Sequence, residues 1–140
     1  FAFKDENIPW PVRQRAVRSF PLVFKDLLGK RCSRTLSHLE EKGSPTNAVC
    51  YMWWDVFPIC AEPKNVLRVP LDLEILDVMS KVLTIEHVAC QESSLHGLGH
   101  WARHYPSEIG RIVDDFLSRT KELRPELKQY ALDARTGRVQ

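Results

Sequence analysis

The sequence has no apolar run long enough to cross a bilayer. No stretch approaches about 18 consecutive apolar residues, so we expect no membrane-spanning helix and no membrane partner. The 140 residues are 44% hydrophobic and 27% charged, which is ordinary for a folded soluble domain. This length fits one domain spanning residues 1–140.

A strong charge of one sign is also lacking. The 20 Lys and Arg residues nearly balance the 18 Asp and Glu residues, which leaves a formal charge of +2. Such a small charge does not make nucleic acid the default partner. The N-terminal third carries several arginines, so DNA binding through a basic face stays open as an alternative. These arginines are Arg13, Arg15, Arg18, Arg31 and Arg34.

Sequence patterns for metal, phosphate and nucleophile chemistry are missing. The four cysteines, Cys32, Cys50, Cys60 and Cys90, form no C-x-x-C pair. We therefore expect reduced, mostly buried thiols in a cytoplasmic protein. Glycine-rich phosphate loops and a G-x-S-x-G elbow are absent as well. No catalytic residue and no cofactor are predicted from these patterns, and an enzyme is the less favoured class.

Helical periodicity dominates what is present, because apolar residues recur at three- and four-residue steps. Gly29 is expected to end the first helix, and Pro45 and Pro70 to open later ones. A last short helix is expected to begin at Pro125. Apart from this last helix, the predicted helices cover residues 10–28, 33–42, 45–59, 71–83, 87–104 and 109–117.

Two short patterns recur at similar intervals. Phe20-Pro21 returns as Phe57-Pro58 after 37 residues, and Ala48-Val49-Cys50 is answered by Val88-Ala89-Cys90 after 40. A period near 40 residues with paired helices is typical of α-solenoids. The predicted units are residues 10–43, 45–84 and 86–120, followed by a charged extension over 121–140.

Two segments resemble HEAT repeats. Val12-Arg13-Gln14-Arg15-Ala16-Val17 resembles the Val-Arg-x-x-Ala start of a first repeat helix, and the stretch from His87 to His100 has a similar small and apolar pattern. The resemblance implies an all-α fold, a short right-handed superhelix of about three helical hairpins. It also implies a non-enzymatic scaffold that binds another protein. Pro21 and Pro58 depart from the pattern, since they fall late in their helices.

A row of four polar side chains at four-residue spacing is the most distinctive feature. Glu92, His96, His100 and His104 share one slowly twisting helix face. The first three could hold a metal or small ligand, with Asp55 or Asp72 as alternative third ligands. Structural histidines that hydrogen-bond neighbouring helices are the simpler interpretation.

Glycines and tryptophans complete the set of candidate residues. Gly97 and Gly99 each cost helix stability, which favours close approach of another helix, with a local break that opens a ligand site as the alternative. Trp53 and Trp54 point about 100° apart, so at least one is expected at a boundary or surface. The predicted partner-binding residues are Trp53, Trp54, Glu92, His96, His100 and Trp101.

Overall fold

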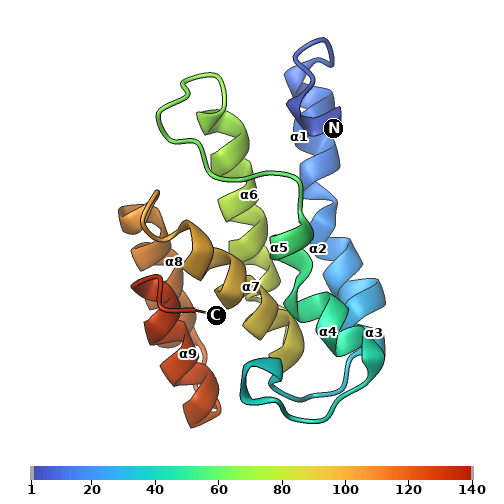
Figure 1. Ribbon diagram of the computed structural model, residues 1–140, viewed down its shortest axis with the longest axis vertical. Helices are drawn as coiled ribbons and strands as arrows, with labels where there is room; N and C mark the ends of the chain where they lie inside the picture. Colours follow the sequence, from blue (N-terminus) through green and yellow to red (C-terminus); the bar gives the residue numbers. More distant parts are fainter. Residues whose placement is uncertain (1, 140) are drawn as a thin grey trace.

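The computed structural model describes residues 2–139, and within them all regular elements are helical. Figure 1 shows the helices lying side by side, with no strand in the described part of the chain. The predicted all-α class is therefore confirmed. The helices are α1 (Trp10–Arg18), α2 (Phe20–Leu22), α3 (Gly29–Arg31), α4 (Pro45–Tyr51), α5 (Trp53–Val56), α6 (Val69–Val82), α7 (Val88–Trp101), α8 (Pro106–Arg119) and α9 (Pro125–Arg135).

The first three helices form one nearly continuous rod. Pro21 lacks a backbone N–H and disturbs the ladder near Ser19, and the chain continues through a π-type segment over Val23–Leu28. The prediction that Gly29 ends this helix is wrong, because the helix continues to Arg31. A Cβ on Gly29 would lie 3.0 Å from the backbone oxygen of Phe24 in the same rod and 3.6 Å from Cys90 Sγ of α7, the latter an ordinary contact.

The segment from 32 to 44 is mostly irregular. The predicted polar helix over 33–42 is wrong, since only the 3₁₀ turn Ser37–Leu39 forms there. Asn47 holds the segment instead: its Oδ1 accepts from Ser33 N at 2.8 Å, and its side-chain amide donates to Ser33 O at 2.9 Å. As predicted, Pro45 opens the next helix, and Asn47 Oδ1 also accepts from the N-cap amide of Ser44 at 3.1 Å.

Helix α7 lies at the centre of the molecule. It contacts α4, α5, α6, α8 and α9, and Figure 1 shows it between α9 on one side and α4 and α5 on the other. The predicted close approach of another helix is confirmed at Gly97, where α5 packs, whereas Gly99 faces a residue beyond the end of α9. A Cβ on Gly97 would lie 2.6 Å from Trp54 Cγ, and one on Gly99 would lie 2.3 Å from a Val139 methyl. The two glycines therefore leave room for a side chain of α5 and for one of the C-terminal segment.

Helix α9 packs along α7 and α8, although its sequence is highly charged. Leu127, Tyr130, Ala131 and Ala134 are buried on its inner face. The last part of the charged extension is thus integrated into the core. The most extensive helix pairing is α7 with α9; α7 also packs on α4 and α6, α8 packs on α9, and the 10–31 rod packs on α6.

Within the described residues, no helix combines the length and the apolar character that a membrane span requires.

Candidate functional site

Helices α5 and α7 bring Asp55, His96 and His100 together. The histidines lie four residues apart on α7, so their rings are neighbours on one face. Asp55 on α5 reaches both rings: its Oδ2 lies 2.9 Å from His96 Nε2, and its Oδ1 lies 3.0 Å from His100 Nε2. The two Nε2 atoms are themselves 3.0 Å apart. Three possible ligand atoms from these residues thus lie within 4.8 Å of one another.

Protons alone cannot satisfy all three of these contacts while Asp55 is a carboxylate. If both Nε2 atoms carry hydrogen and donate to Asp55, two N–H groups face each other at 3.0 Å. If one Nε2 is bare, its lone pair faces a carboxylate oxygen at about the same distance. A single cation among the three atoms removes the conflict, because each then offers a lone pair to it.

The spacing also suits a metal ion. Zinc–nitrogen bonds of about 2.0–2.1 Å at a tetrahedral angle put neighbouring ligand atoms about 3.3 Å apart. The three contacts of 2.9 to 3.0 Å need to widen by only a few tenths of an ångström. Two imidazoles and one carboxylate form a ligand set that binds zinc and other divalent first-row metals.

His96 is fixed from its other side by Tyr130. Its Nδ1 lies 2.9 Å from the Tyr130 hydroxyl, which in turn lies 3.1 Å from the Tyr51 hydroxyl. Burial lowers the pKa of His96, which favours the neutral ring that a metal requires. Nothing in the sequence singled out Tyr130, because its partner on α7 lies 34 residues away.

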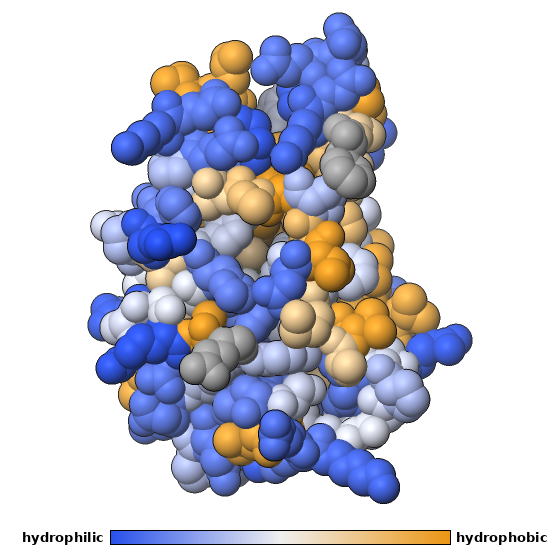
Figure 2. All heavy atoms as spheres, viewed as in Figure 1, coloured by the Kyte–Doolittle hydropathy of each residue, from blue (hydrophilic) through white to orange (hydrophobic). Residues whose placement is uncertain are grey.

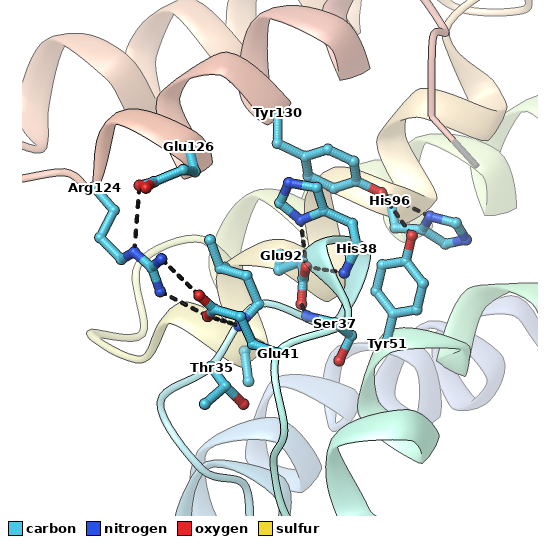
Figure 3. A network of polar contacts seen from close by, with 12 residues as sticks. Thr35, Ser37, His38, Glu41, Tyr51, Glu92, His96, Arg124, Glu126 and Tyr130 are labelled. Carbon is cyan, nitrogen blue, oxygen red and sulfur yellow. Dashed lines mark hydrogen bonds and ion pairs between the residues drawn. The ribbon is translucent and has the colours of Figure 1, made fainter.

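Glu92 does not join this group. Its buried carboxylate accepts hydrogen bonds from Ser37 N at 2.9 Å and His38 N at 2.8 Å, and it contacts His38 Nδ1 at 2.5 Å (Figure 3). Among the described residues, the possible ligand atoms that lie close together with His96 and His100 are therefore those of Asp55 and not those of Glu92. The physical reason is that Glu92 faces the 3₁₀ turn at 37–39, where it satisfies two backbone amides.

The predicted partner-binding residues do not form one exposed face. Glu92 and His96 are 1% exposed, and Trp54 and Trp101 are buried as well. Trp53 is half-buried, with its ring edge-to-face against Phe24 at 5.5 Å, and only His100 is exposed. These side chains were expected at the surface because the sequence does not show which helix faces are covered.

A cavity of about 290 Å³ opens beside the three ligands. Asp55 and His100 line it, together with the aromatic rings of Trp54, Phe57 and Trp101. A small molecule could therefore approach the ligand atoms from solvent. A larger cavity, about 710 Å³, lies at the N-terminal end of α7.

The larger cavity and the basic residues are weaker candidates for a functional site, because several of their charged groups already have partners within the protein. Its lining mixes both signs of charge, and its Arg124 already pairs with Glu41 at 2.9 Å. Two arginines of the predicted basic face are also engaged elsewhere: Arg18 pairs with Glu74 at 2.8 Å, and Arg13 donates to Ile8 O at 2.9 Å. These contacts favour structural roles for the charges concerned.

Comparison of the chain with protein-family models, with curated proteins and with solved structures finds no match.

Proposed function

We propose that this chain is an all-helical metal-binding protein that holds a divalent first-row metal ion at Asp55, His96 and His100. The contact geometry of the three side chains carries the proposal, because protons cannot satisfy all three contacts while Asp55 is a carboxylate, whereas one cation can. Three protein ligands leave at least one coordination position open, as in catalytic zinc sites.

Zinc titration of the purified, chelator-treated chain tests this proposal. We expect one zinc ion per chain and a rise in melting temperature with zinc concentration, since a ligand of the folded state stabilises it. His100→Ala should weaken zinc binding at least tenfold, because it removes a half-exposed ligand with little packing loss.

His104→Ala is the matched control, since His104 is the next exposed histidine of the same row and lies outside the ligand set. Equal zinc affinity in the original chain and in both variants would contradict the proposed site.

The arrangement of helices supports a second proposal, a short superhelix of HEAT-like hairpins. Successive helices pack in pairs, α6 with α7 and α8 with α9, and neighbouring pairs also touch. Division into units at 10–43, 45–84 and 86–120 and the right-handed sense remain predictions. A solenoid of this kind would be consistent with a scaffold in the cytoplasm.

One surface feature favours a protein-binding role beside metal binding. Val49 on α4, Met52 between the two helices and Val56 on α5 are 57%, 44% and 76% exposed. Figure 2 shows orange side chains gathered over these helices. Exposed apolar patches of this type often mark interaction sites.

Proximity labelling in the native host can test this second role. We expect labelled partners to be lost when Val49 and Val56 are replaced by Asp. Val66→Asp, which changes another exposed valine outside this patch, should retain them. The same partners with all three chains would count against this surface.

A further inference from the structure

The cavity beside the ligands has a distinct charge pattern. Arg103 and His104 line it, and neither side chain has a hydrogen-bond or ion-pair partner among the described residues. Asp55 is the one acidic residue among the described residues that line the cavity. With Asp55 bound to a metal ion, the cavity would present two positive centres, the ion and the Arg103 guanidinium, and no unpaired acid.

The rest of the wall is apolar. Trp54, Phe57, Ile59 and Trp101 line the same cavity, and Trp54, Ile59 and Trp101 are at most 8% exposed. These rings and methyl groups can contact a hydrocarbon or aromatic group, whereas the ion and Arg103 can contact only an electron-rich head. The volume of about 290 Å³ restricts the ligand to a small molecule.

We propose that the metal-loaded site binds a small carboxylic acid whose carboxylate occupies the open metal position and pairs with Arg103, while its apolar group lies against Trp54 and Trp101. This inference rests on the proposed metal site. A carboxylate matches both centres, because it is a hard oxygen ligand for the ion and a planar partner for a guanidinium. A free inorganic anion would use the same two centres and leave the aromatic wall unused.

Cobalt substitution makes both steps visible. Cobalt(II) bound by two imidazoles and a carboxylate gives visible absorption bands that change when another ligand enters its coordination sphere. We expect benzoate to change these bands in a saturable manner, and to bind at least fivefold more tightly than acetate, which lacks the ring. A titration with inorganic phosphate, an anion without an apolar group, tests whether the site binds any anion rather than a carboxylic acid. We expect phosphate to bind more weakly than benzoate.

The variant Arg103→Gln tests the second contact. We expect it to weaken benzoate binding about tenfold while cobalt affinity stays unchanged, because Arg103 is not a metal ligand. Arg111→Gln is the matched control, since Arg111 is exposed on α8 and lines a different cavity. Circular dichroism establishes that both variants fold.

The outcomes separate the two proposals. Failure to bind cobalt overturns the proposed function itself. Cobalt binding with bands that benzoate leaves unchanged overturns only the carboxylate inference. Phosphate binding as tight as benzoate, or equal benzoate affinity in Arg103→Gln, also overturns it, because the aromatic wall or Arg103 would then contribute nothing.

Discussion

At the scale of single residues, a substitution at Tyr130 tests most directly how His96 is oriented. Its hydroxyl lies 2.9 Å from His96 Nδ1, so a metal on Nε2 would leave Nδ1–H to donate to this oxygen. Such hydrogen bonds orient metal-binding histidines, and their loss typically costs 10- to 100-fold in affinity. We expect Tyr130→Phe to weaken zinc binding by about tenfold, measured by calorimetric titration.

The control for this prediction is another buried tyrosine. Tyr105→Phe removes a hydroxyl that donates to Asp72 at 2.8 Å, away from the ligands. It should lower stability without changing zinc affinity. Similar losses of affinity in the two variants would show that Tyr130 acts only through the general stability of the fold.

Gly97 illustrates the space that α7 must leave for its neighbours. A Cβ here would lie 2.6 Å from Trp54 Cγ and 3.0 Å from Met79 Cε, and both side chains are buried. We expect Gly97→Ala to lower the free energy of unfolding by about 1–3 kcal/mol, as overpacking does. Urea denaturation measures the change.

Gly110 offers the opposite case on α8. Its nearest neighbour would lie 3.7 Å from an added Cβ, an ordinary contact. Gly110→Ala should therefore be neutral or stabilise by up to about 1 kcal/mol through helix propensity. If Gly97→Ala and Gly110→Ala changed the free energy of unfolding in the same direction, the packing explanation would be contradicted.

At the scale of elements, rules based on neighbouring residues predicted the helices that have a clear N-terminal signal or apolar stripe. The same rules failed where a residue distant in the sequence determines the local conformation. Pro45 and the apolar stripe of α6 could be recognised from neighbouring residues. The segment at 33–42 also has a helical pattern, but Glu92 draws the amides of Ser37 and His38 into a turn. No local rule identifies a carboxylate more than 50 residues away as the partner.

In the candidate site, too, local spacing predicted some residues, whereas others depend on how distant helices pack. The pairing of His96 with His100 follows from their spacing on one helix, so the sequence could predict it. Asp55 was one of three possible third ligands, and the choice among them depends on how α5 lies against α7. The contact of Tyr130 with His96 could not be predicted, because it depends on the packing of α9 on α7. The charged sequence of α9 gave no reason to expect that packing.

The irregular segment at 32–44 is attached to the other end of the chain by an ion pair. Arg124 contacts both Glu41 oxygens at 2.9 Å (Figure 3). The Arg124 guanidinium and the backbone N–H of Leu36 lower the pKa of Glu41 from 4.5 to about 2. This pair therefore stabilises the folded state above about pH 4.5, and its contribution disappears as the pH falls toward 2.

The variant Glu41→Gln tests this dependence. We expect it to be less stable than the original chain at pH 7, with a difference that shrinks between pH 4.5 and pH 2. Thermal melts across that range measure it. Glu40→Gln changes the adjacent exposed acid, which has no ion-pair partner among the described residues, and should show no such trend.

At the scale of the whole molecule, the buried thiols report whether the chain unfolds as one unit. Cys32, Cys50 and Cys90 are free and buried, and they come from the end of the first rod, from α4 and from α7. Cys60 is free and exposed. The central position of α7 links the N-terminal rod to α8 and α9, so removing its contacts should release all of them together.

We therefore expect one thiol to react rapidly in the folded chain and three to react only with global unfolding. Thiol labelling along a urea gradient should give a midpoint equal to those from far-ultraviolet circular dichroism and tryptophan fluorescence. Cys60→Ser should remove the rapid phase alone. If the chain behaved as a stack of independent hairpins, the three buried thiols would become reactive before the helices of α8 and α9 were lost, because nearest-neighbour interfaces would open one at a time. Coincident midpoints would instead mean that packing against α7 couples the two ends of the chain, and through it the Asp55–His96–His100 site to the stability of the whole fold.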